Sequence, residues 1–343
     1  MPIRMKDIAQ DLGVSVVTVS KVLRNHSDIG GATRDRVMRR VKELGYQPNA
    51  SARSLVTGRS SLIGLVVPDL LHAFFAEVAM GLSATLRQKD YCVILASTEE
   101  QPEIERSEIE KLLAHRLDAL VVAASGQSTE LLAKVQAQGT PLVLLDRLIP
   151  GFSASFVGTD DYAVGVLATE HLLSVGCTRI AHIRGTENSV GKLRFEGYRD
   201  TLIKHGLPVL DENVVQWTSV DVQGKRGGAV AMRHLLASRR RADGVFCFND
   251  TIAVGAMNEI LEAGLAIPRD IAIIGCGNSH YDDMLRVPLT SIDQNSRRIG
   301  EKTGKLLLNM LDPKSTPRVR KAIIAPELVE RASTMRKQKG NSK

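Results

Sequence analysis

Residues 5–24, MKDIAQDLGVSVVTVSKVLR, constrain the fold of this chain more than any other segment. A short amphipathic stretch reaches Gly13, which readily takes the positive φ of a sharp bend, and Ser15 can cap the helix that follows. In this second helix, Val16 and Val17 lie on the face away from the first helix. Two apolar side chains fit poorly in water there, but in the major groove of DNA they can contact thymine methyl groups. The segment predicts a helix-turn-helix whose second helix reads DNA, with an ordinary αα-hairpin as the alternative.

Positive charge is concentrated at the N-terminal end of the chain. Residues 1–60 carry eleven Lys and Arg against five Asp and Glu, whereas residues 61–330 carry 29 against 33. A basic head on a nearly neutral body favours contact with DNA phosphates. The last thirteen residues add five positive charges, which we interpret as a solvated tail.

The length and composition set further limits. At 343 residues the chain exceeds what one core supports, so we expect a small headpiece and a larger body. No apolar run approaches the ~20 residues of a membrane span, and the first residues lack the apolar stretch of a secretory signal. We therefore predict a cytoplasmic protein without a membrane partner. The cysteines lack metal-ligand spacing and lie in apolar surroundings, so we expect structural thiols and neither a metal nor another cofactor; they are Cys92, Cys177, Cys247 and Cys276.

Two further helices are expected before residue 60. The first covers residues 33–44 and ends at Gly45; its outer side carries arginines that are candidates for phosphate contacts or for a solvated face. Beyond Pro48, Asn49 can cap a short helix that Gly58 ends. That helix falls below the ~12–15 residues that an isolated helix needs in water, so it should form only when something packs on it.

After residue 60, apolar runs alternate with amphipathic stretches. This pattern predicts parallel sheets covered by helices on both faces, arranged as two doubly wound lobes with a ligand cleft at the carboxyl ends of the strands. The strand-like runs are residues 62–67, 92–96, 119–123, 142–145, 180–183, 245–248 and 271–275. The helical stretches are residues 75–88, 103–115, 129–138, 162–175, 192–205, 224–237 and 250–263.

Several motifs together resemble the LacI/GalR family of bacterial transcription regulators, over essentially the whole chain. They are MKDIAQDLGVSVVTVSKVL, TRDRV with KELGYQPNASARSL, IGLVVPD, VLLDR, GTDD at residues 158–161, FNDTIAVGAM and PLTSIDQ. The resemblance implies a nucleoid-associated repressor that binds a palindromic double-stranded DNA operator as a homodimer. It also implies an α/β, periplasmic-binding-protein-like body whose cleft holds a small-molecule effector, a sugar or sugar derivative.

The resemblance also implies the domain boundaries. A helix-turn-helix domain, small and all-α, would cover residues 1–48, and a hinge helix with a linker would cover residues 49–60. The effector-binding and dimerisation domain would cover residues 61–331, followed by a basic tail at 332–343.

Carried over position by position, the resemblance makes Val16 and Val17 the base-reading pair. Leu55 stands where members of the family insert a leucine into the minor groove, and an apolar wedge there can kink the duplex. A linker leucine packed on the body is the alternative. Ala52 is small enough for the close approach of a second hinge helix. The DNA-binding residues that we predict are Ser15, Val16, Val17, Thr18, Ser20, Lys21, Arg24, Asn25, Thr33, Arg34, Tyr46, Ala52, Arg53 and Leu55.

The resemblance places a second set of residues in the effector cleft. Aromatic faces with charged and amide groups suit a polar, ring-shaped ligand. Structural roles are the alternatives: Phe74 and Phe75 as core, Asp146 with Arg147 as an ion pair, and Asp250 as a helix cap. The predicted effector-binding residues are Phe74, Phe75, Asp146, Arg147, Lys192, Arg194, Trp217, Ser219, Asn249, Asp250 and Asn278.

The cleft departs from the pattern of the family at two positions. Gly277 stands where an aspartate usually contacts the ligand, and Ser219 stands where several relatives place an aromatic residue. Because the cleft loses a carboxylate and carries Lys192 and Arg194, we expect a more cationic site that favours an acidic or phosphorylated sugar.

The sequence offers three other interpretations. A partner protein, and not a small ligand, could control DNA binding. Gly275-x-Gly277 resembles the start of a dinucleotide fingerprint, but the third glycine position holds His280, so we do not expect an enzyme. A purely sugar-binding periplasmic protein would need an export signal and would not need the DNA-binding head.

Overall fold

The computed structural model of the protein describes residues 3–46, 58–217, 224–316 and 318–336. The chain divides into two compact units, Met1–Ser60 and Ser61–Lys343, which are described separately below. No helix within these described ranges is both long and apolar enough to cross a membrane.

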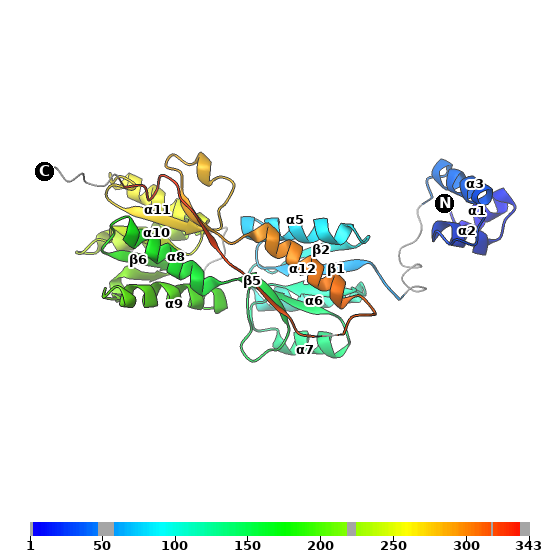
Figure 1. The fold of residues 1–343 in the computed structure, drawn as a ribbon, viewed down its shortest axis with the longest axis horizontal. Coiled ribbons are helices and arrows are strands. Elements are labelled where there is room, and N and C mark those ends of the chain that lie inside the picture. Colours follow the sequence, from blue (N-terminus) through cyan, green and yellow to red (C-terminus); the bar gives the residue numbers. More distant parts are fainter. Residues whose placement is uncertain (1–2, 47–57, 218–223, 317, 337–343) are drawn as a thin grey trace. The chain divides into compact units, whose positions relative to one another are not determined.

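The first unit contains three short helices, α1 (Met5–Leu12), α2 (Val16–Leu23) and α3 (Gly31–Glu43) (Figure 1). Gly13 adopts φ 64° between α1 and α2, as the sharp bend requires. Helix α3 begins two residues before the predicted start because Gly30 takes the extended conformation of a cap. Side chains from all three helices form one small core, which consists of Ile8, Ala9, Val19, Val22 and Val37.

The second unit contains two six-stranded sheets, one in each lobe. The first sheet has the strand order β11-β5-β4-β3-β1-β2, and all of its pairings are parallel. The second has the order β12-β10-β9-β8-β6-β7 and is parallel except for the β10–β12 pair. The strands of the first sheet are β1 (Leu62–Val67), β2 (Cys92–Ser97), β3 (Ala119–Val122), β4 (Leu142–Leu145), β5 (Ser155–Thr159) and β11 (Lys321–Ile324). Those of the second are β6 (Ile180–Arg184), β7 (Val214–Gln216), β8 (Gly244–Cys247), β9 (Ala272–Cys276), β10 (Thr290–Asp293) and β12 (Glu327–Val329).

Helices cover both faces of each sheet, so each lobe has two apolar cores. The helices of the first lobe are α5 (Ala73–Arg87), α6 (Pro102–Ala114), α7 (Thr129–Ala137) and α12 (Ser296–Met310). Those of the second lobe are α8 (Asp161–Ser174), α9 (Ser189–Lys204), α10 (Gly224–Ala237) and α11 (Asp250–Glu262). Two doubly wound lobes are the predicted fold class, which is confirmed apart from the antiparallel edge strand β12.

The chain crosses between the lobes three times, after β5, after β10 and after β11 (Figure 1). The apolar runs in the sequence do not predict these crossings, because they do not reveal the strands on either side of them. Strands β5, β7, β10, β11 and β12 have only three to five residues each, and several carry polar residues. Helix α12 was also missed, since its buried stripe includes small residues such as Gly300 and Gly304 beside Ile299 and Leu307.

Three pairs of helices pack so closely that each partner has a glycine at the contact. A Cβ added at any of these glycines would overlap a backbone carbonyl oxygen of the opposite helix. The pairs are Gly81 with Gly300 in α5 and α12, Gly165 with Gly197 in α8 and α9, and Gly228 with Gly255 in α10 and α11.

We expect Gly81→Ala to lower the free energy of unfolding by about 1–3 kcal/mol, because the added methyl group would meet the carbonyl oxygen of Arg297 and push α12 away from α5. Ser83→Ala, on the same helix and half-buried, is the control and should change stability by less than about 0.5 kcal/mol. Urea unfolding followed by circular dichroism measures both. Equal stability of the two variants would show that α5 and α12 tolerate a wider separation.

Candidate DNA-reading helix and ligand cleft

Helix α2 presents an apolar pair at its capped start. The Ser15 hydroxyl accepts a hydrogen bond from the Thr18 backbone N–H at 3.0 Å, so the predicted cap is present. Val16 and Val17 are 43% and 62% exposed, whereas Val19 and Val22 are buried in the headpiece core. The predicted division of α2 into an inward face and an outward apolar face is therefore observed.

The polar side chains around α2 and α3 make local contacts. Lys21 forms an ion pair with Asp28, and its hydrogen bond lowers the pKa of the Asp28 carboxyl. The Arg24 Nε donates to the Ser20 carbonyl at 3.3 Å, and Arg34 donates to the Asn25 side chain. These exposed contacts are weak in water, so phosphate groups can replace them.

The remaining predicted DNA residues occupy varied surroundings. Ser20 and Thr33 are half-buried, and Tyr46 packs against the headpiece core. Arg40, one of the outer arginines, is held by Asp11 and Glu43, which favours a structural role for it. Ala52, Arg53 and Leu55 lie outside the described residues.

In the second unit, side chains of both lobes enclose a cavity of about 60 Å³. They follow the carboxyl ends of parallel strands, where ligands bind in open α/β sheets. From the first lobe come Pro68, Asp69, His72, Phe74, Phe75, Glu100, Asp146 and Arg147. From the second lobe come Gly185, Thr186, Asn188, Val190, Arg194, Trp217, Phe248, Asn249 and Ile252, and Gln294 lies on a crossing between the lobes.

Three aromatic side chains at the start of α5 form one wall of the cavity. The rings of Phe74 and Phe75 meet edge to face at 5.0 Å between centroids, and the His72 ring lies 5.5 Å from that of Phe75. The His72 Nδ1 accepts the Phe74 backbone N–H at 3.1 Å and so caps the helix. Burial, with the nearby charges of Arg194 and Arg147, lowers the pKa of His72 to about 3, so this ring is neutral at pH 7.

Arg194 is 3% exposed and is held on three sides. Its Nε donates to the Asp161 carboxylate at 2.9 Å, and its second terminal nitrogen lies 2.9 Å from the same oxygen. Its first terminal nitrogen donates to the Phe248 carbonyl at 2.6 Å, and the guanidinium lies 4.7 Å from the centre of the Phe248 ring. A buried guanidinium with a buried carboxylate partner keeps its charge and its position.

Arg147 is paired with Glu100, which the sequence analysis did not predict for the site. Two guanidinium nitrogens of Arg147 donate to the two carboxylate oxygens of Glu100, one of them at 2.8 Å. Asp146, directly before Arg147, adopts φ 63°, a conformation that a non-glycine residue rarely takes.

Three buried polar atoms of the lining have no hydrogen-bond partner. They are the second carboxylate oxygen of Asp69, Nε of Arg147 and Nε1 of Trp217. A buried polar group without a partner costs free energy, which a ligand with donors and acceptors can recover. One acceptor and two donors at one cavity match the hydroxyl groups of a sugar.

Three of the predicted effector residues, Lys192, Asp250 and Asn278, do not line the cavity. Lys192 is exposed, because a residue two positions before Arg194 faces another side of α9. Asp250 and Asn278 are engaged in a separate polar network. The cap of α11 is Asn249, whose side chain accepts the Ile252 N–H at 2.9 Å, and not Asp250. Ser219 lies outside the described residues.

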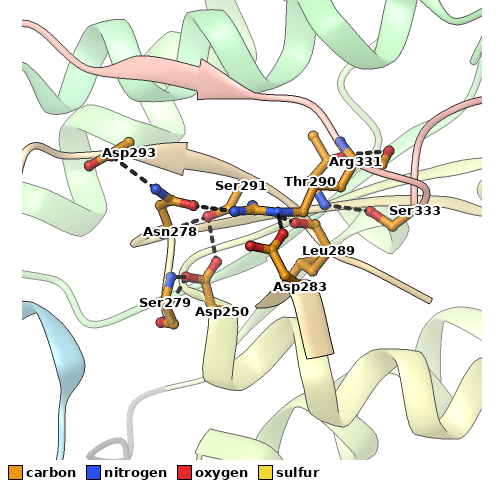
Figure 2. Close-up of polar contacts among 10 residues, drawn as sticks. All are labelled: Asp250, Asn278, Ser279, Asp283, Leu289, Thr290, Ser291, Asp293, Arg331 and Ser333. Carbon is orange, nitrogen blue, oxygen red and sulfur yellow. Dashed lines mark hydrogen bonds and ion pairs between the residues drawn. The ribbon is translucent and has the colours of Figure 1, made fainter. Parts of the chain in front are cut away.

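Figure 2 shows this network behind the start of α11. The Asp250 carboxylate accepts hydrogen bonds from the Ser279 N–H and hydroxyl, both at 3.0 Å, and from the Ser291 hydroxyl at 2.6 Å. Asn278 donates to Asp293 at 3.0 Å and accepts from Arg331 at 2.7 Å, and Arg331 also binds Asp283 and the Leu289 carbonyl. The network fixes the end of β9 against the start of α11, and thereby Asn249 at the cavity.

The network also explains the two glycines at 275 and 277. A Cβ added at Gly277 would come within 2.8 Å of a carboxylate oxygen of Asp250, and one at Gly275 would overlap the other oxygen. Gly277 also adopts φ 135°, which other residues rarely take. The Gly-x-Gly sequence is therefore required by packing against Asp250, and an aspartate at position 277 would place a second carboxylate beside it.

Asp69, His72, Glu100 and Phe248 line the cavity although the sequence analysis did not name them. Asp69 follows β1, Glu100 follows β2 and Phe248 follows β8. The rule that ligands bind beyond the carboxyl ends of parallel strands would have found these three.

Three of the four cysteines have the buried surroundings that the sequence predicts, and one does not. Cys177, Cys247 and Cys276 are buried, and burial raises their pKa values, whereas Cys92 is exposed on the edge strand β2. All four are free thiols. Among the described residues, no three His, Cys, Asp or Glu side chains converge as metal ligands would.

Comparisons with known proteins agree with this architecture. Residues 4–49 match the model of the bacterial regulatory proteins of the lacI family, and residues 60–332 match that of the periplasmic binding proteins and sugar binding domain of the LacI family. The chain is 32% identical to the HTH-type transcriptional regulator GalR of Escherichia coli K12 over 330 residues, 96% of this chain and 95% of GalR. It is 30% identical to the transcriptional repressor PurR of Actinobacillus pleuropneumoniae serotype 3, over 96% of this chain and 97% of PurR.

Solved structures show the same fold. A transcriptional regulator CelR–cellobiose complex has a TM-score of 0.73 at 26% identity and covers 96% of this chain and 99% of its own. The lac repressor dimer bound to operator and the anti-inducer ONPF has a TM-score of 0.84 at 23% identity, over 97% of this chain and 99% of its own.

A helix-turn-helix unit joined to a two-lobed ligand-binding body defines a transcriptional regulator with a ligand-binding domain. The chain belongs to the LacI family of bacterial regulatory proteins. Its relatives are transcriptional regulators and repressors, and not enzymes.

The buried carboxyl of Asp282 makes the stability of the second lobe depend on pH. Its carboxyl is fully buried beside Asp250, and burial with the Asp250 charge raises its pKa to about 9. Folded protein therefore keeps a proton that the unfolded chain releases above about pH 4. The contribution of Asp282 to stability falls as the pH rises between these two values.

We expect Asp282→Asn to reduce the loss of stability between pH 5 and pH 8, because an amide does not titrate. The thermal unfolding midpoint of the wild type should fall more steeply over this range than that of the variant. Glu262→Gln, which removes an exposed carboxylate of α11 in the same lobe, is the control and should retain the slope of the wild type. Identical slopes for wild type and Asp282→Asn would mean that Asp282 is ionised in the folded protein.

Proposed function

We propose that this regulator binds a palindromic DNA operator as a homodimer and that a small polyhydroxylated effector, a sugar or sugar derivative, binds in the cleft between the lobes and changes operator affinity. The observation that carries the proposal is the cleft itself. Side chains of both lobes converge there on a cavity in which one buried acceptor and two buried donors lack partners.

For DNA binding, we assign base reading to Val16 and Val17 at the start of α2. Their exposure would be unfavourable in water but is useful against thymine methyl groups. Lys21, Arg24 and Arg34 would exchange their weak local contacts for phosphates, which are the usual partners of such side chains. The roles of Ala52, Arg53 and Leu55 remain predictions from the sequence.

An exposed apolar surface on the first lobe supports a homodimer. Leu71, Met80 and Leu95 are exposed on or beside α5 and β2, two elements that pack against each other. Met284 is exposed on the second lobe. A two-fold interface over these residues would bury them and would match the symmetry of a palindromic site.

An effector can change operator affinity only if it binds two conformations of the dimer with different affinity. The cleft supplies such a pair, because a ligand that contacts Asp69 and Arg147 of one lobe and Trp217 of the other favours the closed arrangement. Since the operator lies in the nucleoid, we place the protein there.

Val17→Ala should weaken binding to the preferred operator by ~1–3 kcal/mol and binding to random DNA very little, because only the operator presents the matching base edge. The operator is first selected from a random DNA pool, and affinities are then measured by fluorescence anisotropy. Met38→Ala is the control, since it removes an exposed apolar side chain of α3 in the same unit.

Equal losses on operator and random DNA would show that Val17 does not read sequence. In the same samples, sedimentation should give two chains for each operator duplex. One chain for each duplex would contradict the homodimer.

Asp69→Asn should weaken the response to the effector by about tenfold or more, because a hydrogen bond to a charged acceptor contributes ~1.5–3 kcal/mol. The amide keeps the bond that Asp69 accepts from the Leu71 N–H, so the fold should be unaffected. A panel of unmodified mono- and disaccharides is screened by thermal shift, and hits are tested for their effect on operator affinity. Asp90→Asn, on the surface, is the control.

A wild-type response in the Asp69→Asn variant would place the effector elsewhere. If no saccharide shifts either the melting temperature or the operator affinity, control by a partner protein becomes the better explanation.

A further inference from the structure

We propose that Glu100 determines the charge class of the effector: by occupying the guanidinium of Arg147, it excludes anionic ligands from the cleft and selects uncharged or amine-bearing polyols. This inference rests on the proposed function, because it takes the cleft as the effector site. It replaces the expectation of an acidic or phosphorylated sugar, which depended on Lys192 lining the cleft.

The contact between Glu100 and Arg147 is built into the site. The two side chains form a bidentate pair across 47 residues of sequence, with Glu100 25% exposed and Arg147 10% exposed. Planar, bidentate pairing is the strongest arrangement available to a guanidinium and a carboxylate. An anionic ligand would therefore have to displace Glu100 before it could bind the two terminal nitrogens of Arg147.

The backbone around Glu100 directs its side chain into the cleft. Glu99 and Glu100 both adopt the left-handed conformation, with φ 51° and 59°. Hydrogen bonds hold the turn on both sides, from the Thr98 N–H to the Val67 carbonyl at 3.0 Å and from the Gln101 N–H to the Thr98 carbonyl at 2.8 Å. Two consecutive non-glycine residues in this conformation persist only where the surrounding structure fixes them.

More acidic than basic side chains line the cavity. Asp69, Glu100 and Asp146 are acidic, whereas Arg147 and Arg194 are basic and His72 is neutral. Arg194 is also bound to Asp161 and to the Phe248 carbonyl, so its positive charge is already compensated. The terminal nitrogens of both guanidinium groups are therefore not available to a ligand anion without the loss of an existing partner, whereas Nε of Arg147 is left to donate.

The unpartnered atoms indicate what the cleft accepts. The free oxygen of Asp69 accepts a hydrogen bond from a hydroxyl or an ammonium group, and Nε of Arg147 donates one to a hydroxyl oxygen. A carboxylate has no proton to donate to Asp69, and the negative charge of either a carboxylate or a phosphate would be repelled by it. An uncharged polyol satisfies both atoms, and an amine adds an ion pair.

The proposal is tested in the full chain with inorganic phosphate as the probe, at constant ionic strength and without DNA. Glu100→Gln, which keeps the size of the side chain and removes its charge, should bind phosphate with an affinity at least about tenfold above that of the wild type. Binding is measured by isothermal titration calorimetry and by the shift in melting temperature. Glu103→Gln, which removes an exposed carboxylate three residues away on α6, should behave as the wild type.

The gain in phosphate affinity must also depend on Arg147. Glu100→Gln combined with Arg147→Gln should bind phosphate no better than the wild type, and Glu100→Ala serves as a second variant if Glu100→Gln does not fold. The proposal is overturned if the wild type binds phosphate as well as Glu100→Gln, if neither Glu100 variant gains affinity, or if the gain persists without Arg147.

This test is separate from that of the proposed function. One result would be a gain of phosphate binding that requires Arg147, together with an operator affinity that no saccharide changes. It would support the exclusion of anions by Glu100 and contradict the effector function. The reverse pattern would contradict only the role of Glu100.

Discussion

The close approach of α8 and α9 is the contact on which the cleft depends most. Gly165 and Gly197 let each helix lie against a backbone carbonyl of the other, and the carbonyl that meets Gly165 belongs to Arg194. This contact sets the position of the Arg194 backbone, and its side chain then reaches Asp161 at the start of α8. Because α8 begins directly after the first crossing from the other lobe, the guanidinium is anchored to the segment that joins the two lobes.

The buried charges of the cleft follow from this arrangement. Taking an arginine out of water is costly unless a carboxylate and further hydrogen bonds replace the lost hydration. Arg194 obtains these from Asp161 and the Phe248 carbonyl, and Arg147 obtains them from Glu100. Both guanidinium groups are therefore fixed before any ligand arrives, and the unpaired Nε of Arg147, together with Asp69, defines what the ligand must supply.

Local patterns in the sequence predicted the headpiece and the two lobes. The capped start of α2 and its exposed valines depend on residues within one turn of each other, and the apolar runs of the central strands can be recognised without knowledge of their neighbours. Arg147, Arg194, Trp217 and Asn249, which the family resemblance assigns to the effector, line the cavity. Lys192 carries the same assignment but lies exposed on another face of α9, which the resemblance alone does not reveal.

The pairing of Glu100 with Arg147 could not be predicted in the same way. It depends on the order of the strands, which brings the loop after β2 and the loop after β4 to one edge of the sheet. The exclusion of Asp250 from the cavity depends likewise on Ser279 and Ser291, which come from later segments of the chain. Contacts of this kind arise from the topology and leave little trace in the local sequence.

Trp217 makes the ligand cleft observable by tryptophan fluorescence. It is the single tryptophan of the chain, its indole packs against Gly227 of α10, and its Nε1 lies buried without a partner at the cavity wall. Nearly all of the fluorescence excited at the red edge of the protein absorption band therefore comes from one indole beside the ligand site. The emission of the unlabelled protein thus reports directly on the polarity and occupancy of its cleft.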